Sequence, residues 1–196
     1  MSISDRVRLH ELTVLSDNWY TLRKARFDYR MSDGTWQEQT RESYDRGNGC
    51  VCLLYDPARR TVILIRQFRW PAFENGHDDL LIEAPAGLLD EADPAERMRA
   101  ELEEETGYRI ATLTPLWDAF MSPGSVTERL HFFVGRYSPD DRIDQGGGVE
   151  DEGEDIEVLE LPLTEALEMI DDGRIRDAKT IMLLQHAALH LMPGAI

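Results

Sequence analysis

Acidic side chains gather on one predicted helix near the middle of the chain. The stretch Ala86–Tyr108, AGLLDEADPAERMRAELEEETGY, begins with a glycine turn and a short acidic loop, and its helix ends at Gly107. At roughly 100° per residue, Glu101, Glu104 and Glu105 fall in one quadrant of this helix. An apolar stripe lies beside them, formed by Ala95, Met98 and Leu102. The spacing therefore predicts three carboxylates that converge on one side of an anchored helix.

Such a cluster is unfavourable unless a positive charge neutralises it, because like charges three or four residues apart on a helix repel each other. Carboxylate oxygens are ligands that suit Mg²⁺ or Mn²⁺. A solvated charged helix face is the alternative interpretation of any such run. The turn Pro85–Gly87 before the helix and the glycine stop after it favour a metal site.

The same stretch resembles the signature helix of the Nudix hydrolases, whose pattern is G-x5-E-x7-R-E-U-x-E-E-x-G-U with U apolar or aromatic. The second half of the pattern matches at Glu101-Leu102, at Glu104-Glu105 and at Gly107-Tyr108. This resemblance implies a divalent metal bound by glutamates of the helix.

Two departures from the Nudix pattern concern the arginine and the loop. Ala100 replaces the arginine that precedes the first glutamate of the helix, and the loop from Gly87 is one residue shorter than the pattern. Arg97, one turn earlier, and Arg99 are the two candidates for the missing positive partner of Glu101.

The resemblance covers nearly the whole chain and is to the GDP-mannose hydrolases of the Nudix superfamily. The segments that carry it are Leu15–Leu22, Glu42–Gly49, Ile65–Arg69, Met121–Phe133 and Gly146–Leu161. It implies a Nudix fold, with a mixed sheet between helices, and a homodimer in which the N-terminal sheet crosses to the other subunit. That exchange would cover aromatic surface that a short N-terminal sheet cannot bury by itself.

The resemblance also implies a set of site residues. Mg²⁺, or Mn²⁺ in its place, would be held by the carbonyl of Ala86, by Glu101 and Glu105, and by Glu152 or Glu154 from a later acidic loop. The residues expected to contact the nucleotide sugar are Trp19, Arg41, Glu42, Arg69, Ala86, Gly87, Glu128, Asp151 and Lys179.

The acidic loop Gly146–Asp155, GGGVEDEGED, allows two interpretations from its composition. It is either a solvating linker or a glycine-hinged active-site loop that brings one carboxylate to the metal. The family resemblance favours the second, because a late loop of this kind supplies a glutamate that acts as a base or a metal ligand in the related enzymes. Glu152 and Glu154 both remain candidates for that residue.

These features predict hydrolysis of a pyrophosphate linkage, with Glu104 and Glu105 on the helix and a loop carboxylate in the catalytic set. For GDP-mannose the products would be GMP and mannose 1-phosphate. Three alternatives remain open. They are an ADP-ribose pyrophosphatase, which shares the fold and the metal site, a non-catalytic sensor of nucleotide sugars, and an acidic structural domain without a ligand.

Composition limits the partners of the protein. The chain of 196 residues has 21 basic and 38 acidic residues and a net charge of −17, which argues against a nucleic-acid surface. No apolar run approaches the roughly 20 residues of a membrane span, and residues 1–10 lack the features of a signal peptide. The two cysteines, Cys50 and Cys52, are poorly placed for a disulfide, so we expect a reduced, cytoplasmic setting.

We expect two parts in the chain, an N-terminal β-sheet region over residues 1–48 and a Nudix domain over residues 49–196. Alternating apolar and polar residues predict three N-terminal strands over Arg8–Leu15, Tyr20–Tyr29 and Thr35–Tyr44. This region is expected to serve dimerisation and substrate contacts, since its aromatic residues require a surface to pack against.

The second region predicts a single α/β arrangement of intermixed strands and helices. The predicted strands are Cys50–Tyr55, Thr61–Phe68, Asp79–Glu83, Leu113–Phe120, Leu130–Tyr137 and Asp155–Leu161. Besides the acidic helix, an amphipathic helix is predicted from Thr164 to about Asp172, and a closing helix over Lys179–Leu191. The polar run Ser138–Asp155 is expected to be a mobile loop.

Overall fold

A computed structural model describes residues 2–89, 92–149, 151 and 153–194. The chain divides into two compact units, each with its own sheet. The first unit contains Met1–Asn48 and Phe120–Arg129, and the second contains Gly49–Ala119 and Leu130–Ile196. The first unit therefore includes Phe120–Arg129 in addition to the N-terminal region expected from the sequence.

The first unit is an antiparallel sheet of three strands. A short 3-10 helix, Ile3–Arg6, precedes β1 (Val7–Asp17), β2 (Thr21–Arg30) and β3 (Trp36–Asp45). The second turn contains Gly34 at φ 89°, a left-handed conformation that glycine adopts without strain. The three predicted N-terminal strands are thus confirmed, each shifted by one or two residues at its ends.

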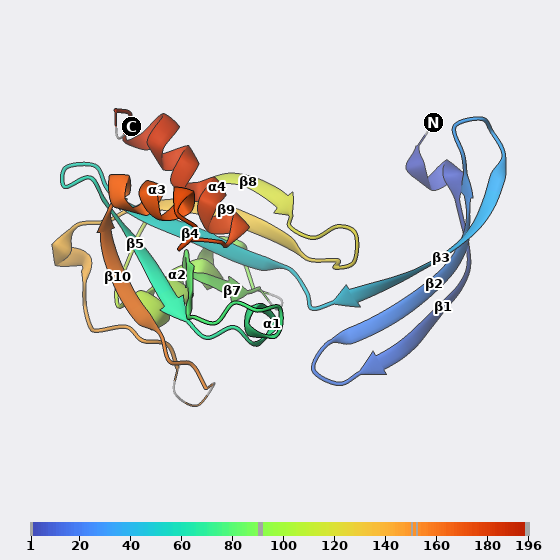
Figure 1. Ribbon diagram of the computed structural model, residues 1–196, viewed down its shortest axis with the longest axis horizontal. Coiled ribbons are helices and arrows are strands. Elements are labelled where there is room, and N and C mark those ends of the chain that lie inside the picture. The colour runs from blue at the N-terminus through green and yellow to red at the C-terminus, as the bar shows by residue number, and fades with distance from the viewer. Residues whose placement is uncertain (1, 90–91, 150, 152, 195–196) are drawn as a thin grey trace. The chain divides into compact units, whose positions relative to one another are not determined.

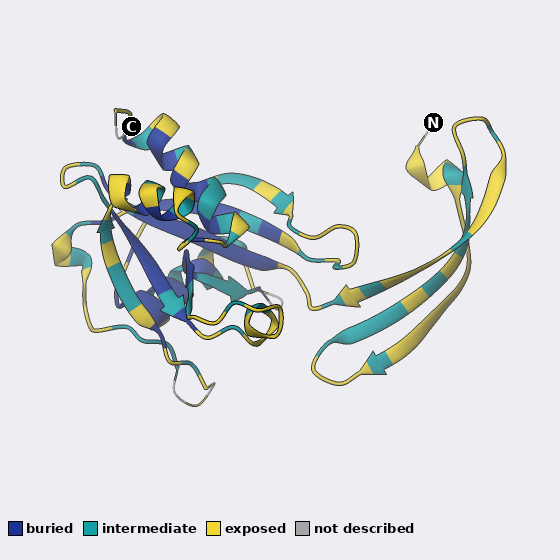
Figure 2. Cartoon of the chain, in the orientation of Figure 1, coloured by how far each residue is buried: buried dark blue, intermediate teal, exposed yellow. Residues whose placement is uncertain are grey.

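No residue of β1, β2 or β3 is buried, as Figure 2 shows by the absence of dark blue in these strands. Leu9, Leu12 and Val14 of β1 are each more than half exposed, at 60%, 55% and 55%. Elsewhere in this unit an arginine covers an aromatic ring, with the guanidinium of Arg8 3.8 Å from the ring centre of Trp36. Such an array of exposed apolar side chains is typical of a surface that binds a partner.

The second unit is built on a seven-stranded mixed sheet (Figure 1). The strand order is β10-β5-β4-β9-β8, with β6 paired to β5 and β7 paired to β4. Their bounds are β4 Gly49–Asp56, β5 Thr61–Gln67, β6 Leu81–Glu83, β7 Ala86–Leu88, β8 Leu113–Phe120, β9 Arg129–Arg136 and β10 Glu157–Pro162. The β4 and β9 strands are parallel, whereas β4 and β5 are antiparallel. This is the mixed sheet that the sequence predicted.

The central strands separate where the candidate site begins. Residues 54–56 of β4 pair with residues 61–63 of β5. Beyond that point β4 pairs instead with β7, and β5 pairs with β6. The short segment β6–β7 therefore fills the space between two diverging core strands, and it brings residues 83–88 against the helix that follows.

The helices of the second unit lie on both faces of its sheet (Figure 1). Their bounds are α1 Trp70–Glu74, α2 Pro94–Thr106, α3 Leu163–Asp171 and α4 Ala178–His186, with a π-helical turn at Ala187–Leu191. Cys50, Cys52 and Leu54 alternate along β4 and share a buried cluster with Met98 and Leu102 of α2. The apolar stripe predicted for the acidic helix is therefore the stripe that packs on the sheet. The sequence interpretation missed α1 and β7.

The acidic helix α2 has clear signals at both ends. The Asp93 carboxylate accepts hydrogen bonds from the backbone amides of Ala95 and Glu96 at 3.0 and 3.1 Å, and Pro94 occupies the first turn. Gly107 ends the helix at φ 75°. Because these signals are local in the sequence, the limits of this helix were predictable.

Gly146, Gly147 and Gly148 lie against the C-terminal turn of α2. The amides of Gly147 and Gly148 donate to the carbonyls of Glu105 and Glu104, both at 3.0 Å. A Cβ atom on Gly146 would lie 2.5 Å from the carbonyl carbon of Thr106. Gly147 and Gly148 thus satisfy helix carbonyls that would otherwise lack partners, and Gly146 allows the close approach. This differs from the expected mobile loop, since the glycines attach to the helix and do not form a free hinge.

Among the residues that the structure describes, no helix is both long and apolar enough to cross a membrane.

Candidate functional site

Two buried glutamates of α2 face the turn between β6 and β7. The Glu101 and Glu105 side chains lie one helical turn apart, and the two residues are only 6% and 2% exposed. The Ala86 amide donates a hydrogen bond to Glu105 Oε2 at 3.1 Å. A Cβ atom on Gly87 would lie 1.8 Å from Glu101 Oε1, so only glycine leaves room for this carboxylate. The third glutamate of the predicted cluster, Glu104, is exposed to solvent.

Arg97 supplies a positive charge beside Glu101. Its Nη2 atom lies 2.5 Å from Glu101 Oε1, across one turn of the helix. The sequence left Arg97 and Arg99 open as replacements for the arginine missing at Ala100, and the structure places Arg97 in that contact. The side chain reaches Glu101 because residues four apart lie on the same helix face.

Burial makes the charged forms of these glutamates unfavourable. It raises the pKa of Glu101 to about 7, a rise that Arg97 opposes and that Glu104 and Glu154 increase. It raises the pKa of Glu105 well above its usual range, and Glu101 and Glu154 reinforce this effect. A pair of buried carboxylates with a cation beside only one of them is an environment in which a divalent metal would replace protons.

The acidic loop places one carboxylate in electrostatic range of both glutamates. Glu154 accepts a hydrogen bond from the Val149 amide at 3.0 Å, and its charge raises the pKa values of Glu101 and Glu105. Asp151 is exposed. Glu152, the other candidate for the loop carboxylate, lies outside the described residues. Of the two, therefore, Glu154 is the one for which the structure gives a position.

The chemistry of these donors fits a hard divalent cation. Two buried carboxylates and the Ala86 carbonyl are oxygen ligands of the kind that Mg²⁺ and Mn²⁺ prefer. Among the described His, Cys, Asp and Glu side chains, three ligand atoms approach within 4.8 Å of one another at His10, Asp28 and Glu38 of the first unit, not on α2. Those first-unit residues are exposed or half-buried, and Arg26 contacts Glu38 at 3.1 Å.

A buried ionic network lies beside the same turn. Glu83, the last residue of β6, accepts hydrogen bonds from Arg69 Nε at 2.7 Å and from Lys179 Nζ at 2.6 Å. Lys179 Nζ also contacts Asp177 Oδ1 at 2.9 Å. Arg69 and Lys179 were predicted as substrate contacts, whereas Glu83 and Asp177 were not. The sequence held one signal for Glu83, an acidic residue at the end of an otherwise apolar strand.

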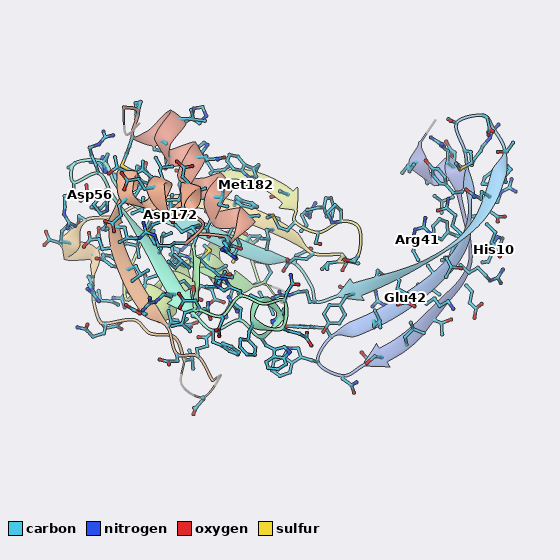
Figure 3. The ribbon with its side chains drawn as sticks, viewed as in Figure 1. His10, Arg41, Glu42, Asp56, Asp172 and Met182 are labelled. Carbon is cyan, nitrogen blue, oxygen red and sulfur yellow. The ribbon has the colours of Figure 1, made fainter. Side chains whose placement is uncertain are left out.

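The remaining predicted substrate residues belong to the first unit. Trp19 is 85% exposed in the turn between β1 and β2. Arg41 and Glu42 are neighbours on β3 and are both exposed (Figure 3). Glu128 is half-buried and lies 3.4 Å from Arg46 Nε, whose guanidinium stands over the Tyr20 ring at 5.6 Å. The predicted site residues are therefore divided between the two units.

Comparison with known families assigns the class of the protein. A family model described as the NUDIX domain matches residues 45–184, which is more than half of the chain and includes the whole of α2. The chain belongs to the Nudix family. Nudix hydrolases generally use divalent metal ions, in agreement with the oxygen ligands described above. A second model, described as the GDP-mannose pyrophosphatase NudK N-terminal domain, matches residues 6–44.

Curated relatives resemble the chain over nearly its full length. A GDP-mannose pyrophosphatase of Pectobacterium atrosepticum is 53% identical over 188 residues, covering 95% of this chain and 96% of that protein. A protein of the same name from Yersinia pestis is 48% identical over 195 residues, covering 99% and 98%. A crystal structure of an ADP compounds hydrolase matches with a TM-score of 0.70 and 19% identity, covering 97% of each chain, and it supports the fold.

The contact between Arg97 and Glu101 predicts a difference between two neighbouring arginines. Replacing Arg97 with Met keeps the aliphatic part of the side chain but leaves a buried carboxylate without its cation. We expect a loss of about 1–3 kcal/mol in the free energy of unfolding near neutral pH. Arg99→Met, the matched control, should change it by less than about 0.5 kcal/mol. Urea denaturation of the metal-free protein measures both, and equal effects would contradict the pairing.

The raised pKa values predict a pH-dependent response to metal. The pKa of Glu101 is about 7 in the folded protein and 4.5 ordinarily. At pH values between these two, Glu101 is protonated in the folded protein and ionised in the unfolded chain. The contribution of this group to stability therefore falls as the pH rises from about 4.5 to about 7, and a bound cation would restore it. MgCl₂ should raise the melting temperature more at about pH 8 than at about pH 5.5, where protons compete with the metal. Glu101→Gln should largely remove that difference, and an equal Mg²⁺ effect at both pH values would refute this account.

Proposed function

We propose that the protein hydrolyses the pyrophosphate linkage of a nucleoside diphosphate sugar, with GDP-mannose as its substrate and Mg²⁺ as its metal. The products would be GMP and mannose 1-phosphate. The observation that carries this proposal is the pair Glu101 and Glu105, buried against Ala86 and Gly87 on a Nudix helix. The choice of GDP-mannose is supported by two relatives of that activity by name, each matched over nearly the full length of both chains.

The residues that would hold the metal are Glu101, Glu105 and the carbonyl of Ala86, with Glu154 or Glu152 added from the acidic loop. When bound there, Mg²⁺ would offset the negative charge that develops on the phosphoryl oxygens. The buried positions of Glu101 and Glu105 support this assignment, because carboxylates held out of water gain most from a cation.

The other residues of the second unit would bind the substrate and move a proton. Arg69 and Lys179 carry the positive charges that suit phosphate oxygens. The loop carboxylate would accept a proton from water as the water oxygen bonds to one phosphorus and the bridging P–O bond breaks. The position of Glu154 near both metal-binding glutamates supports it in that role. Exposed Glu104, on α2 with Glu101 and Glu105, would belong to the same catalytic set.

Recognition of the nucleotide and assembly would involve the first unit. Trp19 would stack on the base or sugar, while Arg41, Glu42 and Glu128 would make polar contacts, with Gly87 and Asp151 from the second unit. The exposed apolar side chains of β1 support a homodimer that exchanges its N-terminal sheet, and light scattering tests this assembly. The free, buried thiols of Cys50 and Cys52 are compatible with a cytoplasmic enzyme.

Substrate choice is tested by separate incubation with GDP-mannose, GDP-glucose, ADP-ribose and ADP-glucose, with Mg²⁺ or Mn²⁺ in ¹⁸O-labelled water. We expect the fastest turnover with GDP-mannose and Mg²⁺, and the labelled product identified by mass spectrometry shows which phosphorus is attacked. Faster turnover of ADP-ribose would identify ADP-ribose as the substrate, while the reaction would still be hydrolysis of a pyrophosphate linkage. A complete lack of turnover would indicate a sensor of nucleotide sugars.

Single carboxylate replacements test the assignment of the site. Glu105→Gln preserves shape but removes the buried charge, and it should lower kcat by about 10²–10³-fold, the typical effect of removing one group that stabilises charge in the transition state. Glu154→Gln should lower kcat by about 10²-fold if it is the loop base, with Glu152→Gln as its matched control. Activity of Glu105→Gln at the wild-type level, measured on protein with unchanged circular dichroism, would remove α2 from the mechanism.

A further inference from the structure

Glu83 contacts both of the cations assigned to phosphate binding in the second unit. One of its carboxylate oxygens accepts from Arg69 Nε at 2.7 Å, and the other accepts from Lys179 Nζ at 2.6 Å. Its side chain is 4% exposed, against 41% for Arg69 and 13% for Lys179. The carboxylate is therefore the most buried member of this network, and the Arg69 side chain is more exposed than that of Lys179.

The contacts leave donors of both cations available. Within the described part of the chain, Arg69 uses Nε for Glu83, and no hydrogen bond involves its two Nη groups. Lys179 Nζ makes two contacts, to Glu83 and Asp177, of the three that an ammonium group can donate. An anion with several oxygens, such as a diphosphate, could bind these remaining donors without displacing Glu83.

The network is fixed to the backbone of the turn between β6 and β7, which is the metal-binding turn of the proposed function and contains Ala84. The Ala84 amide donates to Thr180 Oγ1 at 2.7 Å, and Thr180 Oγ1 lies 2.6 Å from Asp177 Oδ2. Asp177 also caps the first turn of α4 through the Thr180 amide. Burial acts against the charge on Arg69, but Glu83 and Glu105 raise its pKa, which places the network in electrostatic range of the predicted metal ligands.

We propose that Glu83 is a positioning residue, which holds the Arg69 guanidinium and the Lys179 ammonium together as one diphosphate-binding pair beside the metal-binding turn. This inference rests on the proposed function for the identity of the anion. It assigns a role in the reaction to a buried carboxylate that would contact neither substrate nor metal. Without Glu83, the partly exposed Arg69 side chain would lose its hydrogen bond to the carboxylate, and the two cations would repel each other.

The proposal determines the sign of the effect of removing the Glu83 charge. If Glu83 were merely a negative charge near the site, Glu83→Gln would strengthen the binding of an anion, because repulsion would be lost. If it holds the two cations in place, the same change weakens binding, because each cation uses a different carboxylate oxygen and the amide replaces one of these acceptors with an NH₂ donor. The two interpretations therefore predict opposite changes in the dissociation constant.

The experiment is calorimetric titration of inorganic pyrophosphate into the full-length protein in EDTA, which needs no turnover, no metal and no guanine. Glu83→Gln should raise the dissociation constant about tenfold, the effect of losing roughly one charged hydrogen bond. Glu157→Gln is the matched control, since it removes an exposed carboxylate that contacts Arg66 Nε at 3.0 Å in the same sheet. The control should leave the constant within about twofold.

A double-mutant cycle shows whether Glu83 acts through Lys179. In a Lys179→Met background, Glu83→Gln should raise the dissociation constant of pyrophosphate by less than about threefold, since one of the two cations that Glu83 contacts is absent. With GDP-mannose and Mg²⁺, the KM of Glu83→Gln should rise about tenfold while kcat falls less than about threefold, as expected for a contact made before and during reaction. If Glu83→Gln does not fold, Glu83→Asp takes its place, because the shorter side chain cannot reach both cations.

Several results would overturn the proposal. The first is pyrophosphate binding that is unchanged or tighter in Glu83→Gln. The second is an equal rise in the dissociation constant on Glu83→Gln with and without Lys179→Met. The third is no binding of pyrophosphate by the wild-type protein. A failure of the proposed function looks different, because the wild-type protein would then bind pyrophosphate, with the expected loss in Glu83→Gln, yet would not hydrolyse GDP-mannose.

Discussion

Two carboxylates held out of water one helical turn apart constrain much of the second unit. Glu101 and Glu105 repel each other, and burial makes their charges still less favourable. Each feature around them reduces that cost in a different way. Arg97 contacts one oxygen of Glu101, the Ala86 amide donates to Glu105, and Gly87 leaves space where any other residue would collide with Glu101. The divergence of β4 and β5 is what admits the β6–β7 turn to this position.

The features that the sequence predicted are those encoded by nearby residues. Asp93, Pro94 and Gly107 set the limits of α2, and the spacing of Met98 and Leu102 identified its packed face. Apart from β7, the strands of both units followed from alternation and from runs of branched residues. Exposure of Glu104 was not predictable from helix spacing, because that depends on where the edge of the sheet lies under the helix.

Features that depend on distant residues were out of reach. Glu83 and Lys179 are 96 residues apart, and their contact is set by the packing of α4 against the sheet. The strand β7 has three residues and no alternation long enough to detect. Gly146–Gly148 looked like a hinge because glycine-rich segments are often flexible. Their positive φ angles and the absence of room for a Cβ atom at Gly146 and Gly148 show a different reason for glycine, which is close approach to neighbouring atoms.

The attachment of these glycines to α2 bears on how such enzymes can diversify. The amides of Gly147 and Gly148 donate to the carbonyls of Glu105 and Glu104, so the start of the acidic loop is attached to the last turn of α2. Residues beyond this anchor can then be inserted or deleted over generations without moving the helix. The reach and charge of the loop can therefore differ between related proteins while the turn that carries Glu104 and Glu105 keeps its position.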